Sequence, residues 1–153
     1  MLTHAPHAAE TPIVGLAAPL RPAAAPRALP RTIPAAFDPR ACAAWAAVEG
    51  LAPGDAVALM MREPAEAASL GLGLARAGVR ATSLDPGLRG AALASALTAT
   101  GAGLAVVDSA LAEAYAGVMG RLDAYPAVWW NGPGADFCRL DRALAEYAVP
   151  AAR

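Results

Sequence analysis

The chain has 153 residues, a formal net charge of −1 and a mean hydropathy of +0.40, which is enough for one domain with a hydrophobic core. All 12 basic residues are Arg and no Lys is present, which excludes a Schiff-base lysine or a phosphate-loop lysine from this chain. The basic residues are scattered, so the sequence predicts neither a nucleic-acid surface nor a polybasic membrane patch.

Residues 1–36 are rich in Pro and Ala, and their prolines interrupt any regular helix or strand. We therefore expect a flexible leader over residues 1–36 and a single α/β domain over residues 37–150. Both His residues, His4 and His7, lie in this leader without a cluster of other ligands. A Ser–His or Cys–His nucleophile pair is thus excluded from the folded domain, and we expect no metal site.

The first helix is expected to begin at Pro39. Asp38 is a suitable N-cap, and proline is favoured as the first residue of a helix. Phe37 and Cys42 stand at the positions of a hydrophobic staple. Gly50 marks the end of this helix.

After this helix, a turn, a short apolar run and a helix follow one another repeatedly. The apolar runs are continuous, which is typical of strands covered on both faces, and strands joined by helices indicate a parallel sheet. The adjacent Trp129 and Trp130 would point to opposite faces. We therefore predict a three-layer α/β sandwich with about four parallel strands. The expected strands are 56–61, 79–84, 104–107 and 127–130, and the expected later helices are 64–76, 88–100, 111–122 and 140–147.

Residues 90–107 carry no charge and approach the length of a membrane span. Their pattern changes from helix to strand at Gly101, and they contain several Gly, Ser and Thr residues. We therefore expect no transmembrane segment. The chain also begins without the basic and apolar regions of a secretory signal.

Three glycine-containing segments resemble ligand-binding loops. Thr98 to Gly103 leads from a helix into a strand, the reverse of a phosphate loop, and is expected to end the helix. Gly71 and Gly73 lie inside a predicted helix, so we expect them to allow close packing of that helix on the sheet. The segment from Asn131 to Asp136 does follow a strand, but Pro133 removes a donor, so a plain turn is favoured over a phosphate site.

Several acidic residues flank the predicted strands. Asp55, Asp85 and Asp108 are placed as in the acidic pocket of a phosphoacceptor domain, but such a domain needs a lysine. We expect Asp85 and Asp108 to cap helix starts instead. Glu63 and Glu66 would complement the dipole of the helix that begins at Pro64.

No catalytic, cofactor-binding or metal-ligating residue is therefore assigned. Cys42 and Cys138 lack the spacing of a metal or redox motif, so we expect two buried, reduced thiols and a cytoplasmic protein.

Four segments together resemble the N-terminal part of AMP-forming acyl-CoA synthetases, most closely the fatty-acid transport protein or very-long-chain branch. Arg89 and Gly90 belong to the most specific of them, in which Ser95 replaces a His that is frequent in that branch. The segments are Gly50 to Met61 (GLAPGDAVALMM), Arg62 to Glu66 (REPAE), Gly71 to Val79 (GLGLARAGV) and Leu88 to Leu97 (LRGAALASAL).

The resemblance covers residues from about Phe37 to Ala148, but only about a quarter of a full enzyme. It implies ATP and coenzyme A as cofactors of the full-length family, which joins a fatty acid to AMP and then to coenzyme A. The phosphate loop, the adenine-site motif and the catalytic lysine of that family have no match here. We therefore expect a truncated relative of a fatty acyl-CoA synthetase that is inactive and binds no cofactor on its own.

Two alternatives remain open at this point. The chain could be a non-enzymatic α/β interaction protein or a partner subunit of a split synthetase, which associates with a synthetase chain or with itself through an exposed apolar face. It could also bind a small ligand at the carboxyl ends of the strands, near Asp85, Asp108 and Asn131.

Overall fold

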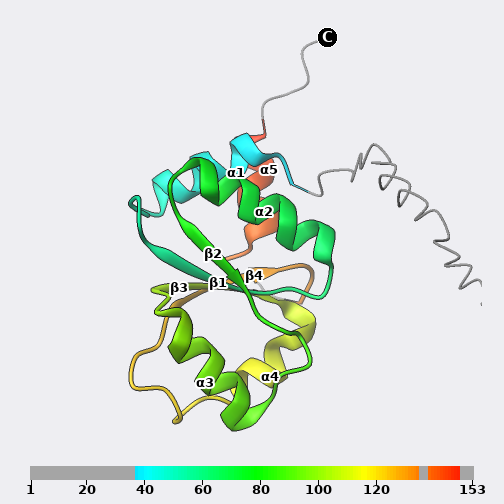
Figure 1. The fold of residues 1–153 in the computed structure, drawn as a ribbon. Coiled ribbons are helices and arrows are strands. Elements are labelled where there is room, and N and C mark those ends of the chain that lie inside the picture. Colours follow the sequence, from blue (N-terminus) through cyan, green and yellow to red (C-terminus); the bar gives the residue numbers. More distant parts are fainter. Residues whose placement is uncertain (1–36, 135–137, 149–153) are drawn as a thin grey trace, which may run out of the picture. The chain divides into compact units, whose positions relative to one another are not determined.

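The computed structural model describes residues 37–134 and 138–148 (Figure 1). Their four strands form one parallel sheet in the order β2-β1-β3-β4. The elements in chain order are α1 (Pro39–Val48), β1 (Ala56–Met60), α2 (Pro64–Arg76), β2 (Arg80–Ser83), α3 (Gly90–Thr100), β3 (Leu104–Asp108), the 3₁₀ helix η1 (Ser109–Leu111), α4 (Ala112–Ala116), β4 (Ala127–Asn131) and α5 (Leu140–Tyr147).

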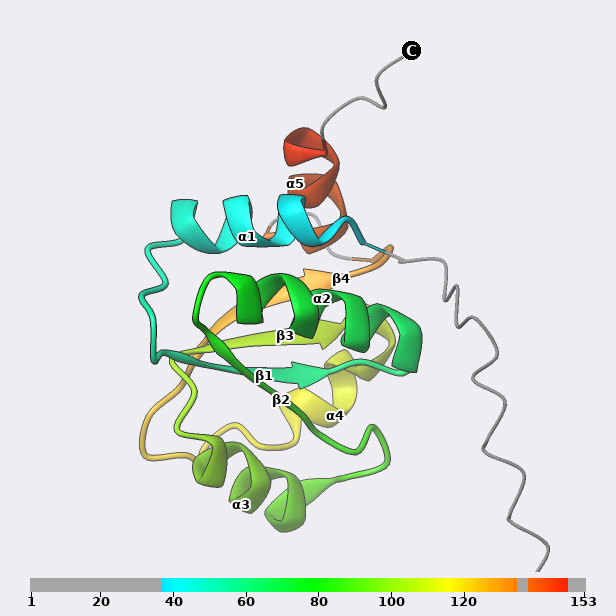
Figure 2. The same ribbon diagram turned by 45° about the horizontal axis from the view of Figure 1, so that its top comes forward.

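The sheet is the middle layer of three (Figures 1 and 2). Helices α1, α2 and α5 cover one face, where Leu70, Leu74 and Leu140 join a buried cluster with alternate residues of the strands. Helices α3 and α4 cover the other face, where Leu93 and Val118 belong to a second cluster. The predicted α/β sandwich with four parallel strands is confirmed, and the predicted leader lies outside the described residues.

The two adjacent tryptophans of β4 do point to opposite faces of the sheet. Trp129 meets Trp45 of α1 in an edge-to-face contact with ring centroids 5.5 Å apart. Trp130 meets Tyr115 of α4 in a similar contact at 6.3 Å. Because successive side chains of a strand alternate between faces, this pair ties β4 to both helical layers.

Burial along the strands depends on their place in the sheet. Every residue of the central strands β1 and β3 is buried, as continuous apolar runs predict. In contrast, β2 is an edge strand, and three of its four residues, Arg80, Thr82 and Ser83, are exposed.

The bounds of α1, α2 and α5 are those predicted, but α4 is much shorter than the predicted helix 111–122. It ends at Ala116, and the chain then turns with Gly117 and Gly120, the latter at φ +81°. Val118 and Leu122 are nevertheless buried. Val118 lies in this turn and Leu122 just after it, but both keep the apolar spacing of a helix, and the sequence pattern misled us for that reason.

Predicted helix ends are confirmed at three positions. The Asp38 carboxylate accepts a hydrogen bond from the backbone N–H of Arg40 at 2.8 Å, as expected of an N-cap. Gly50 follows α1 at φ +74°, and Gly101 ends α3 in the left-handed region at φ +61°. The Thr98 to Gly103 segment is therefore a helix C-terminus.

The two glycines of α2 contact different partners. A Cβ on Gly71 would lie 3.8 Å from the Ala81 side chain of β2, which is the expected contact with the sheet. A Cβ on Gly73 would instead overlap the Cys42 side chain of α1 and lie 3.0 Å from the Pro39 carbonyl oxygen. Gly73 thus sets the close approach of two helices, a role that we did not predict.

Within the described part of the chain, no helix has both the length and the apolar character that a membrane crossing requires.

Candidate functional site

Asp108 is a buried carboxylate at the carboxyl end of the central strand β3. One of its oxygens accepts a hydrogen bond from the backbone N–H of Arg62, in the loop between β1 and α2, at 2.7 Å. The guanidinium Nε of Arg62 lies 3.9 Å from the same oxygen, although the Arg62 side chain is largely exposed. A carboxylate can remain buried here because it accepts hydrogen bonds and has a nearby positive charge.

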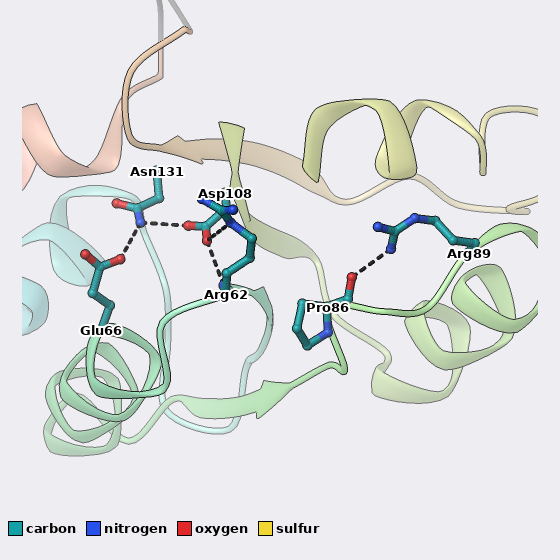
Figure 3. A network of polar contacts seen from close by, with 6 residues as sticks. All are labelled: Arg62, Glu66, Pro86, Arg89, Asp108 and Asn131. Carbon is teal, nitrogen blue, oxygen red and sulfur yellow. Dashed lines mark hydrogen bonds and ion pairs between the residues drawn. The ribbon is translucent and has the colours of Figure 1, made fainter. Parts of the chain in front are cut away.

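Asn131, at the end of β4, connects this carboxylate to α2 (Figure 3). Its side-chain amide donates to Asp108 at 2.8 Å and to Glu66, in the first turn of α2, also at 2.8 Å. Both N–H groups of the amide therefore have carboxylate acceptors. Asp108 and Asn131 also face each other in the register of β3 and β4.

The network joins the ends of three elements and satisfies its own buried polar groups. The prediction that Asp108 caps the next helix is wrong, because its side chain makes no such bond and contacts Arg62 and Asn131 instead. Glu63 stands at the N-cap position of α2 and Glu66 in its first turn, which are positions where a negative charge complements the helix dipole. The hydrogen-bond network of Asp108 chiefly fixes the positions of the strand ends.

The other two acidic residues stabilise turns. Asp85 accepts a hydrogen bond from the Gly87 backbone N–H at 2.7 Å and lies well before α3, so the prediction that it caps a helix is wrong. Asp55 accepts a hydrogen bond from the Ala52 backbone N–H at 2.8 Å. Aspartate commonly stabilises a turn in this way by bonding to nearby backbone. The structure does not bring Asp55 and Asp85 into the network of Asp108.

Arg89, at the start of α3, could contribute positive charge near the same edge of the sheet. Its guanidinium donates to the carbonyl oxygen of Pro86 (Figure 3) and to that of Leu88, each at 2.7 Å. An open hollow of about 450 Å³ adjoins it. The lining residues are Arg89, Gly90, Ala110, Glu113, Ala114 and Gly117. Because Arg89 already bonds to its own loop and is exposed, it braces the turn before α3.

The Asn131 to Asp136 loop is described only as far as Gly134. Gly132 and Gly134 have φ values of +94° and +106°, so this part of the loop is a turn, as favoured from the sequence. A Cβ on Gly132 would lie 3.3 Å from the Ser109 hydroxyl. Ala135 and Asp136 lie outside the described residues.

The two cysteines have different surroundings. Cys42 is fully buried in α1, and burial, together with the charge of Asp38, raises the pKa of its thiol to about 11. Cys138 is exposed, which corrects the prediction that both thiols are buried. Its carbonyl oxygen accepts a hydrogen bond from the Trp130 backbone N–H at 2.7 Å.

Residues 37–134 and 138–148 contain no group of three or more His, Cys, Asp or Glu side chains that could hold a metal ion. His4 and His7 lie outside this part of the chain. Sequence reasoning placed Asn131 near Asp108 only as part of a possible ligand site, and it missed Arg62 and the hydrogen bonds that join the three residues. The signal was available, because polar residues that end neighbouring parallel strands meet at one edge of the sheet.

The sequence is similar to that of a curated protein, long-chain fatty acid transport protein 1 from Bos taurus. The two are 45% identical over 73 residues, which make up 48% of this chain and 11% of that protein. No protein-family model matches the chain. The likeness therefore covers about a tenth of the length of the relative.

Solved structures show the same fold within longer chains. The N-terminal domain of FACL13 from Mycobacterium tuberculosis is 26% identical with a TM-score of 0.58, over 74% of this chain and 28% of that one. A long-chain-fatty-acid-CoA ligase from Archaeoglobus fulgidus is 18% identical with a TM-score of 0.61, over 70% and 21%. A benzoate CoA ligase from Burkholderia xenovorans is 23% identical with a TM-score of 0.60, over 76% and 23%. The chain is thus similar in sequence to a fatty acid transport protein over about half of its own length, and it shares the fold of one segment of the acyl-CoA ligases.

Proposed function

We propose that this chain supplies a scaffold segment of an AMP-forming fatty acyl-CoA synthetase and does not form an acyl-adenylate by itself. The observation that carries the proposal is the 45% identity to a fatty acid transport protein over 73 residues, together with the absence of lysine from the sequence. The sequence identity favours fatty acids as the substrates of the complete enzyme. The absence of lysine removes the cation that acyl-adenylate formation ordinarily uses.

The polar groups at the strand ends support the proposal that the chain forms no acyl-adenylate by itself. Adenylation develops negative charge between a carboxylate and the α-phosphate of ATP, and catalysis needs donors fixed at that point. Here Asp108 and Asn131 are bonded to each other, and Arg89 is bonded to its own loop. The buried charge of this edge is a carboxylate, which would repel a triphosphate.

The proposal is tested by ATP–pyrophosphate exchange with the purified chain, magnesium and fatty acids of short, medium and long chain length. We expect no exchange above the protein-free blank. A full-length long-chain fatty-acid-CoA ligase in the same buffer serves as the positive control. Exchange that coelutes with the chain during size-exclusion chromatography would overturn the proposal. The same experiment tests whether the chain uses ATP.

A partner subunit of a split synthetase is the second candidate function. The small share of its relatives that the chain matches, 11% of the curated protein and 21–28% of two of the solved structures, supports it. Co-expression with a chain that carries the remaining segments of a ligase should then yield a complex that adenylates fatty acids. Recovery of the two chains in separate fractions, without activity on mixing, would exclude this function.

We also propose a cytoplasmic location and a domain that occupies residues 37–150 behind a leader. The free thiols Cys42 and Cys138 support the location. Cell fractionation tests the first proposal, and limited proteolysis tests the second, with a protected fragment that begins near Phe37 as the expected product.

A further inference from the structure

Asn131 is the only residue of the chain with a side-chain amide, because the sequence contains one Asn and no Gln. Gly132 follows it directly. Asparagine loses its side-chain ammonia most readily before glycine, because glycine has no side chain to obstruct the approach of its backbone nitrogen. The one thermolabile amide of this chain therefore stands at the end of β4, inside the hydrogen-bond network of Asp108.

The loss of ammonia needs only these two residues and water. The Gly132 backbone nitrogen, after it has lost its proton, attacks Cγ of Asn131, and the new N–Cγ bond closes a succinimide ring. The Cγ–Nδ2 bond breaks, and Nδ2 takes up a proton and leaves as ammonia. A water molecule then opens the ring at either carbonyl carbon, which leaves aspartate or isoaspartate at position 131. The net reaction consumes one water and releases one ammonia for each chain.

The folded structure holds this amide in place (Figure 3). Its Nδ2 donates to Asp108 and to Glu66, each at 2.8 Å, and Asn131 is only 7% exposed. Ring closure would turn the side chain away from both acceptors and remove a donor from the buried Asp108 carboxylate, which is unfavourable. The two carboxylates also disfavour the negative charge that the Gly132 nitrogen acquires before it attacks.

The product of the reaction does not fit the place of the amide. Deamidation puts an oxygen where Nδ2 stood, so a third carboxylate would stand at hydrogen-bond distance from Asp108 and Glu66. Like charges that are close together and shielded from water repel one another strongly. Arg62 offsets little of this repulsion, because its Nε lies 3.9 Å from Asp108 and its side chain is largely exposed.

We propose that Asn131 is a site of spontaneous deamidation, that the folded network suppresses the reaction, and that the product prevents the network from closing again. Deamidation then occurs while the strand ends are open, and it makes that opening permanent. The site acts as a one-way switch that accumulates with the time the network has spent open. This chemistry does not depend on the proposed function, because it requires neither a ligand nor a partner.

Isoelectric focusing measures the reaction, because each event makes the net charge more negative and no other side-chain amide contributes. The chain is incubated in native buffer and in denaturing guanidinium chloride at one pH and temperature. We expect deamidation in both, at least about tenfold slower in native buffer, because the folded state reacts only through local opening. Mass spectrometry of the tryptic peptide between Arg121 and Arg139 assigns the change to Asn131. Equal rates, or no reaction in the denatured chain, would refute the proposal.

Two variants and a matched control test the protection by the network. Asp108→Ala and Glu66→Ala each remove one acceptor of the amide. In native buffer each should raise the rate about fivefold or more, the change expected for the loss of one hydrogen bond. Asp55→Ala removes a carboxylate outside the network and should leave the rate unchanged. An unchanged or slower rate in either folded variant would contradict the proposal. Circular dichroism checks folding, and if Asp108→Ala does not fold, Glu66→Ala decides.

Asn131→Asp tests whether the network accepts the product. Asn131→Ala is its control, because it loses the same hydrogen bonds without adding a charge. At neutral pH we expect the equilibrium constant for unfolding of Asn131→Asp to exceed that of Asn131→Ala by about tenfold or more. Guanidinium denaturation followed by tryptophan fluorescence measures both constants. An equal or smaller constant for Asn131→Asp would overturn the proposal, because the network would then accommodate a third carboxylate.

Discussion

Asp108 and Asn131 are register partners at the ends of β3 and β4, and the side-chain amide of Asn131 donates to the Asp108 carboxylate at 2.8 Å. The same carboxylate accepts the backbone N–H of Arg62 from the loop after β1. Two strand ends and a loop entering α2 are thus held by one buried acid. Such a group stabilises the fold only while its partners remain in place.

Asp108→Ala should lower the free energy of unfolding by about 2–4 kcal/mol, because it leaves the Arg62 N–H and the Asn131 amide without their acceptor. Urea denaturation followed by tryptophan fluorescence measures this change. Asp55→Ala is the control, since it removes a carboxylate that accepts one exposed backbone hydrogen bond, and about 0.5–1 kcal/mol is expected. Equal losses for both variants would contradict a special role for Asp108.

Gly73→Ala should destabilise the protein by about 1–3 kcal/mol, the usual effect of an overpacked contact. The added methyl would overlap the Cys42 side chain and force α1 and α2 apart. Gly71→Ala, two residues earlier in the same helix, meets Ala81 at an ordinary 3.8 Å and should gain about 0.5–1 kcal/mol from helix propensity. Thermal unfolding of the two variants should shift in opposite directions, and a parallel shift would refute this account.

Tyr115→Phe should leave the stability unchanged or raise it by up to about 1 kcal/mol, because the buried Tyr115 hydroxyl has no hydrogen-bond partner among the described residues. The ring contact with Trp130 does not involve the hydroxyl and is retained. Tyr125→Phe should instead be slightly destabilising, since the Tyr125 hydroxyl accepts the Gly120 backbone N–H. A clear loss of stability in Tyr115→Phe would show that the hydroxyl is bonded after all.

Alkaline pH should weaken the fold through Cys42. Burial raises the pKa of this thiol from 9.0 to about 11, so the unfolded chain loses its proton first as the pH rises. The folded state then binds more protons than the unfolded state, and the free energy of unfolding falls between about pH 9 and 11. Burial also raises the pKa of Tyr115, which acts in the same direction at higher pH.

Lysine titration does not contribute to this pH dependence, because the chain has no lysine. Urea midpoints at about pH 8 and pH 10.5 should differ in the native sequence and less in Cys42→Ala. Cys138→Ala should keep the full difference, since Cys138 is exposed. An unchanged difference in Cys42→Ala would assign the effect to other groups.

The sequence predicted those elements whose ends carry their own signals. Asp38, Pro39 and Gly50 define both ends of α1, and the continuous apolar runs of β1 and β3 predicted strands covered on both faces. The predicted helix 111–122 was too long because Val118, in a turn, and Leu122, just after it, still pack inward. Spacing alone does not distinguish a helix from a turn that happens to bury the same face.

The candidate site was predicted less well than the fold. Asp108 has the local sequence of a cap, but its partners Arg62 and Asn131 lie 46 and 23 residues away. Only the register of the sheet brings them together. Cys138 likewise gave no sign of exposure, because free cysteines are usually buried.

The two edges of the sheet are not equivalent. On the β4 side, the Trp130 N–H donates to the Cys138 carbonyl oxygen, and Arg139 forms a short parallel bridge with Trp130, so the following chain covers one position of that border. The β2 border has no such bridge among the described residues. A strand added from another chain would therefore meet fewer occupied backbone groups at β2 than at β4.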